Sequence, residues 1–84
     1  MNLFLVVLGG RIRGGHVEIH DVRWVIGKTI ESTIPKLKSE WIGLAKGLHI
    51  DSYKLIRFVE GYQIKIVSTK EIKQSEVNKC SRSL

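Results

Sequence analysis

The 84-residue sequence has a single cysteine, Cys80, and a single proline, Pro35. One cysteine cannot form a disulfide within the sequence, which is typical of proteins in a reducing compartment, so we expect a cytoplasmic location. Long apolar runs are also missing: residues 3–8 form the longest one, far short of the about 20 residues that span a membrane. This N-terminal run lacks the basic start of a signal peptide. We interpret it as a buried strand and expect no membrane association.

Negative charge is scarce, because eight Asp and Glu residues stand against fourteen Lys and Arg residues, which gives a net charge of +6. Such a surplus permits weak attraction to nucleic acid or to an acidic partner. The basic residues are scattered, however, and no run resembles a basic arm. We therefore do not expect specific nucleic-acid binding and keep weak association as a third interpretation only.

The apolar fraction of 43% is that of a folded globular chain, and the length suits one small domain. We place this α+β domain at residues 1–68. Residues 69–84 are mostly polar and basic, so we expect a flexible C-terminal tail. Cys80 in this tail has no His, Cys or acidic partner at metal-ligand spacing.

Two strand patterns begin the domain. Residues 3–8 are apolar on both alternating faces, which is typical of a central strand that is covered above and below. In residues 16–26 the apolar positions change from odd to even between Ile19 and Val22. A regular strand cannot place both sets on one face, so we predict a β-bulge near His20 and Asp21.

A helix is predicted after Gly27, because apolar residues recur on one stripe at helical spacing. The stripe consists of Ile30, Ile34, Leu37, Trp41 and Leu44. Thr29 is the expected N-cap and Gly43 the expected stop. Pro35 lies inside the pattern, so we predict one helix with an irregular beginning; a later start at Thr33 is the alternative.

The remaining apolar residues predict a closing hairpin. A two-residue turn at Glu60 and Gly61 would mix the polar and apolar faces, so we favour a three-residue loop, residues 59–61. That loop has Gly61 in the left-handed conformation and pairs Phe58 with Tyr62. The predicted fold is α+β with the order β-β-α-β-β: a mostly antiparallel four-stranded sheet with one helix packed on one face.

Two polar stretches, "GGHVEIHDVRW" at residues 14–24 and "GLHIDSY" at residues 47–53, contain the candidate site residues. We expect both to lie on the uncovered side of the sheet, with Tyr53 on the same face as the second stretch. The candidate ligand or metal cluster consists of Glu18, His20, Asp21, His49 and Asp51. Imidazole and carboxylate groups together can bind a divalent metal ion or exchange protons near neutral pH. The alternative is that these residues only solvate an open face. No motif identifies the metal or a cofactor, and no catalytic residue stands out.

The glycine-rich loop "GGRIRGG" at residues 9–15 is a second candidate. Its backbone N–H groups, together with Arg11 and Arg13, could hold an anion. The spacing matches no phosphate-binding loop and no helix follows it directly, so we favour a flexible connection.

The central first strand predicts a partner. Phe4, Val6 and Leu8 on one face and Leu3, Leu5 and Val7 on the other all have to be kept from water, and one helix can cover only one of these faces. A second subunit on the open face is the simplest cover, and we expect a homodimer.

Three elements occur in an order that resembles the bacterial family known as domain of unknown function 1543. They are Leu8-Gly9-Gly10, Glu18 with His20-Asp21, and His49-Ile50-Asp51, and the resemblance covers about residues 3–67. It implies no assigned activity, so no catalytic residue is carried over. Some members carry the unit twice, which implies that a single copy pairs with itself.

These observations predict a cytoplasmic, dimeric binding or assembly module rather than an enzyme. A metal- or small-ligand-binding protein or enzyme that uses the His and Asp residues is the alternative.

Overall fold

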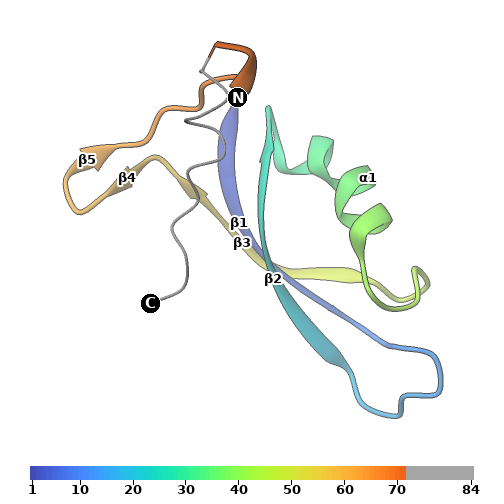
Figure 1. Ribbon diagram of the computed structural model, residues 1–84. Coiled ribbons are helices and arrows are strands. Elements are labelled where there is room, and N and C mark those ends of the chain that lie inside the picture. The colour runs from blue at the N-terminus through green and yellow to red at the C-terminus, as the bar shows by residue number, and fades with distance from the viewer. Residues whose placement is uncertain (72–84) are drawn as a thin grey trace, which may run out of the picture.

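The computed structural model describes residues 1–71 (Figure 1). The elements are β1 (Asn2–Gly10), β2 (Ile19–Gly27), α1 (Ile30–Glu40), β3 (His49–Ile56), β4 (Phe58–Val59), β5 (Tyr62–Gln63) and the 3-10 helix η1 (Thr69–Glu71). The predicted tail lies outside the described residues from position 72 onwards, and Cys80 lies outside them too. Within residues 1–71, no helix has the length and apolarity that crossing a bilayer requires.

β1 is the central strand of an antiparallel three-stranded sheet with the order β2-β1-β3, as its two apolar faces predicted. α1 lies against one face of this sheet (Figure 1), which confirms the α+β class with a single helix on one side. The last strand does not join the sheet as predicted, because β4 and β5 form a separate hairpin. The sheet therefore has one face covered by α1 and an open face.

The side chains of β1 alternate between these two faces. Phe4, Val6 and Leu8 are buried on the side of α1, where they form the core together with Val25, Ile30, Leu37 and Trp41. Leu3, Leu5 and Val7 lie on the open face and are only half-buried. A single chain thus covers one side of its central strand fully and the other side in part.

α1 begins where the sequence predicts. Thr29 is the N-cap and forms a capping box with Ser32: the Ser32 N–H donates to Thr29 Oγ1 at 3.2 Å, and the Thr29 N–H donates to Ser32 Oγ at 3.3 Å. Pro35 lies inside the helix. The helix ends at Glu40 rather than near Gly43, because Trp41 turns to an extended conformation and packs its indole ring beside Gly10.

A Thr29→Ala substitution is expected to lower the free energy of unfolding by about 1 kcal/mol, because it leaves an N-terminal N–H of α1 without its side-chain acceptor. Urea denaturation followed by circular dichroism measures the change. Ser39→Ala is the matched control, since the Ser39 hydroxyl donates to Lys36 O in the exposed last turn. An equal loss in the two variants would contradict the capping role.

β2 is a regular strand. It pairs with β1 without interruption along its whole length, so the bulge predicted near His20 and Asp21 is wrong. Val17 precedes the strand and is 75% exposed, so it does not have to share a buried face with the apolar residues of β2. The change of apolar positions from odd to even therefore requires no bulge. The even-numbered apolar residues of β2 lie on the open face. They are Val22, Trp24 and Ile26.

The irregularity lies in β3 instead. Val7 pairs with Ser52 and the next residue, Leu8, pairs with Ile50, so Asp51 is the extra residue of a β-bulge. The bulge shifts the parity of the residues that follow it. Tyr53, which we expected on the open face, therefore lies on the side of Phe4, with the ring centroids 6.2 Å apart and edge to face.

The hairpin has the two-residue turn that the sequence argument rejected. Val59 pairs with Tyr62, and both turn residues have positive φ, 51° at Glu60 and 83° at Gly61. Gly61 is in the left-handed region as predicted, but the three-residue loop is wrong. The three-residue loop was favoured because it pairs Phe58 with Tyr62. These side chains are 66% and 76% exposed, so no burial of apolar surface favours that pairing.

Candidate functional site

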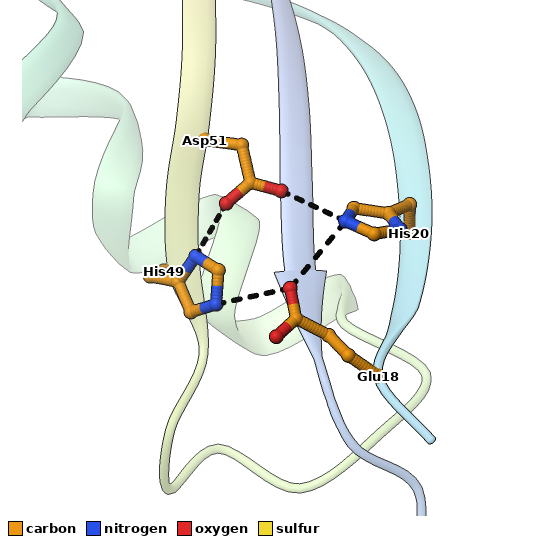
Figure 2. A network of polar contacts seen from close by, with 4 residues as sticks. All are labelled: Glu18, His20, His49 and Asp51. Atoms are coloured by element: carbon orange, nitrogen blue, oxygen red, sulfur yellow. Dashed lines mark ion pairs between the residues drawn. The ribbon is translucent and has the colours of Figure 1, made fainter.

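Four of the five candidate ligand residues converge on one point of the open face (Figure 2). They are Glu18, His20, His49 and Asp51, and we call them the His–carboxylate cluster. His20 Nε2 lies 3.4 Å from Glu18 Oε1 and 3.0 Å from Asp51 Oδ2. His49 Nδ1 lies 2.6 Å from Asp51 Oδ1, and His49 Nε2 lies 3.3 Å from Glu18 Oε1. Imidazoles and carboxylates thus alternate around a closed ring.

β1 provides the floor of the cluster. Gly9 pairs with His20 of β2 on one side and with His49 of β3 on the other. Neighbouring strands lie about 4.8 Å apart, so the backbones of the two histidines are about 10 Å apart and their side chains meet above Gly9. A Cβ at Gly9 would overlap Glu18 Oε1 and would lie 2.7 Å from Asp51 Oδ2. The sequence signal, which we missed, is a glycine that ends an apolar strand.

The bulge in β3 places the second carboxylate. Because Asp51 is the extra residue, it has no partner on β1 and lies between Ser52, which pairs with Val7, and Ile50, which pairs with Leu8. Its carboxylate reaches back along β3 to His49 and across β1 to His20 (Figure 2). A bulge often redirects a side chain in this way beside functional sites.

The ring of contacts is short of positive charge. Carboxylate oxygens only accept hydrogen bonds, and a neutral imidazole carries one N–H. His49 presents both ring nitrogens to carboxylates, and His20 presents one nitrogen to two of them. Two neutral imidazoles therefore supply two N–H groups for four contacts. Either additional protons or a metal cation would supply the missing charge.

The cluster is open to solvent, with side chains between 31% exposed at Asp51 and 57% exposed at His20. Ion pairs with this exposure contribute about 0–1 kcal/mol each to stability. The cluster is therefore a weak contributor to the fold, and a ligand from solvent can reach it.

Asp21 does not belong to the cluster, and its inclusion was wrong. Without the predicted bulge, Asp21 points to the opposite face from His20. There its Oδ2 lies 3.9 Å from Arg23 Nη1, and Arg23 also pairs with Glu40 of α1 at 3.4 Å. Asp21 thus takes part in a charged network between β2 and the end of α1.

Arg11 and Arg13 lie exposed in the loop between β1 and β2. The loop contacts the segment after α1, since the Leu44 N–H donates to Arg11 O at 2.7 Å, and a turn forms where the Gly15 N–H donates to Ile12 O at 3.0 Å. Anion binding by the two guanidinium groups stays a prediction, as does weak nucleic-acid association.

A cavity of about 370 Å³ lies on the covered side of the sheet, between α1 and β3. Its lining is mostly apolar and consists of Leu8, Ile34, Leu37, Lys38, Leu48, His49 and Ile50. The sequence did not reveal it, because the helical stripe alone does not tell which strand the helix leaves uncovered.

The sequence profile described as Domain of Unknown Function (DUF1543) matches residues 15–66, which is more than half of the chain and contains the whole cluster. The chain belongs to the DUF1543 family. The resemblance to this family inferred from the sequence is thereby confirmed; the match includes both His-Asp elements and begins after Leu8-Gly9-Gly10. No curated protein matches the sequence.

A solved structure is similar to this DUF1543 chain: the crystal structure of a protein Il1583 from Idiomarina loihiensis. The two are 44% identical with a TM-score of 0.69, and the similarity covers 74% of this chain and 42% of that one. The present chain thus spans less than half the length of that protein.

Proposed function

We propose that the protein is a homodimeric binding module whose subunits pair through the open face of the sheet. One observation carries the proposal: Val22, Trp24 and Ile26 of β2 are 58%, 60% and 46% exposed on that face. Leu3, Leu5 and Val7 of β1 lie beside them in register. A contiguous apolar patch of this kind on a small protein is typical of an interaction surface.

A second copy of the chain is the partner that this apolar patch fits best. The patch runs along β1 from Leu3 to Val7 and ends beside the cluster above Gly9, so two copies can bury it face to face at the about 10 Å spacing of stacked sheets. A two-fold dimer uses the same patch on both subunits. The similar protein from Idiomarina loihiensis supports this pairing, because the matched region fills only 42% of its length and leaves room for a second unit of this size. The proposal keeps the cytoplasmic, bacterial setting expected from the sequence.

Trp24→Glu tests the interface. The wild-type chain is expected to sediment at micromolar concentration with twice its mass of 9.6 kDa, and Trp24→Glu is expected to sediment as a monomer, because a charge would be buried at the centre of the contact. Ile42→Glu is the matched control: Ile42 is 73% exposed in the segment after α1, outside the patch.

Ile42→Glu is therefore expected to remain dimeric. A monomeric wild type at these concentrations, or the same dissociation in both glutamate variants, would contradict the proposed interface.

A further inference from the structure

We propose that Glu18, His20 and Asp51 bind a divalent first-row transition-metal ion, for which zinc is the best fit, and that His49 positions the carboxylates. All four residues belong to one chain, so this inference goes beyond the dimer and is independent of it.

The distances from His20 Nε2 to the two carboxylates already match the separation that such an ion needs. His20 Nε2, Glu18 Oε1 and Asp51 Oδ2 lie within 4.8 Å of one another. In a tetrahedral zinc site with bonds of about 2.0–2.1 Å, ligand atoms lie about 3.3 Å apart. The distances from His20 Nε2, 3.4 Å to Glu18 and 3.0 Å to Asp51, bracket this value. Three protein ligands leave a fourth position open to water or to a small ligand.

His49 lies outside this ligand set and supports it. Its Nδ1 is 2.6 Å from Asp51 Oδ1, while Oδ2 of the same carboxylate faces His20 (Figure 2). The contact between Nδ1 and Oδ1 therefore orients Asp51 with Oδ2 toward the ion. Carboxylate ligands of metal ions are commonly held by an outer hydrogen-bond partner of this kind.

Two features favour a bound cation over a group of polar side chains that only contact water. They are the two carboxylate charges and the absence of a side chain at Gly9. Two carboxylates converge above Gly9, where a Cβ would overlap one of them and crowd the other. Like charges repel at this range, and the exposed ion pairs offset the repulsion only weakly. Side chains that only solvated the face would gain as much by pointing to water. A dication among them neutralises both carboxylates.

The donor set predicts which ions bind. Imidazole nitrogen suits zinc, cobalt and nickel, whereas magnesium and calcium prefer oxygen ligands in larger number. Zinc and cobalt are therefore expected to bind, and magnesium and calcium in large excess are not expected to displace them.

The test uses untagged protein. Calorimetric titration with zinc chloride is expected to show one ion per chain, and cobalt is expected to give the visible absorption of a nitrogen- and oxygen-ligated site. Asp51→Asn and His20→Gln are expected to lower zinc affinity by about 100-fold or more, because each removes a ligand. His49→Gln is expected to lower it by about 10–100-fold while the cobalt spectrum keeps its shape, since the ligands are unchanged.

His16→Gln and Asp21→Asn are the matched controls, because they remove the third histidine and the nearby aspartate that lie outside the cluster. Both are expected to bind zinc as the wild type does, and so is the interface variant Trp24→Glu. Absence of saturable binding at one ion per chain would overturn the proposal. An equal loss of zinc affinity in His16→Gln and His20→Gln would overturn the assigned ligands. A loss of zinc affinity in Trp24→Glu would overturn a site built from one chain.

Discussion

A Gly9→Ala variant is expected to lose about 100-fold in zinc affinity while remaining folded, a result that depends on the proposed metal site. The new methyl group would occupy the space where the cluster converges, overlapping Glu18 Oε1 and crowding Asp51 Oδ2 and the His49 ring. These atoms are the ends of exposed, flexible side chains, so they can swing away at low cost. Calorimetric titration with zinc and urea denaturation measure the two effects on the same sample.

Gly10→Ala is the matched control for Gly9→Ala, because the neighbouring glycine faces the other side of the sheet. A Cβ at Gly10 would lie 2.8 Å from Trp41 Cζ2, and Trp41 is buried in the core. Overpacking of this kind costs about 1–3 kcal/mol of stability. Gly10→Ala should therefore be less stable yet bind zinc normally when folded. If Gly10→Ala lowered zinc affinity and Gly9→Ala lowered only stability, Gly9 would not be the residue beneath the metal site.

Leu8→Ala is expected to lower the free energy of unfolding by about 2–5 kcal/mol. Leu8 is 1% exposed, lies at the centre of the covered face and lines the cavity between α1 and β3. Truncation would enlarge a space that the surrounding side chains already leave unfilled. A chain of this size has a total stability of about 4–13 kcal/mol, so the variant is expected to be partly unfolded at 37 °C.

Leu44→Ala makes the same chemical change at a site that is 44% exposed in the segment after α1. It is expected to cost less than about 1 kcal/mol, because little apolar surface returns to water. Thermal unfolding followed by circular dichroism compares the two variants. A similar melting temperature for both would mean that the covered face is not the core.

Several elements follow directly from local sequence patterns. Residues 3–8 are apolar at every position, and a central strand can bury the side chains on both of its faces. Thr29 precedes a helical stripe and caps the helix that follows. His20 and His49 come together as expected, because antiparallel strands bring each beside Gly9 from opposite sides.

The errors in β2 and β3 have physical causes. The predicted bulge in β2 assumed that Val22, Trp24 and Ile26 face the core, whereas the structure places them on the open face. Parity shows which residues share a face, but it does not show which face α1 covers. The misplaced assignments of Asp21 and Tyr53 follow from this limit and from the unforeseen bulge at Asp51. A strand that is apolar on its uncovered side is what a subunit interface requires.

Fluorine NMR of protein labelled with 5-fluorotryptophan tests most directly whether a second copy covers the open face. The chain has two tryptophans, Trp24 on that face and Trp41 in the core, so the second resonance is an internal reference. On dilution below the dimer dissociation constant, we predict that the Trp24 resonance shifts and becomes sensitive to solvent deuteration, while the Trp41 resonance stays in place. A Trp24 resonance that is solvent-exposed and unchanged at every concentration would contradict the proposed homodimer.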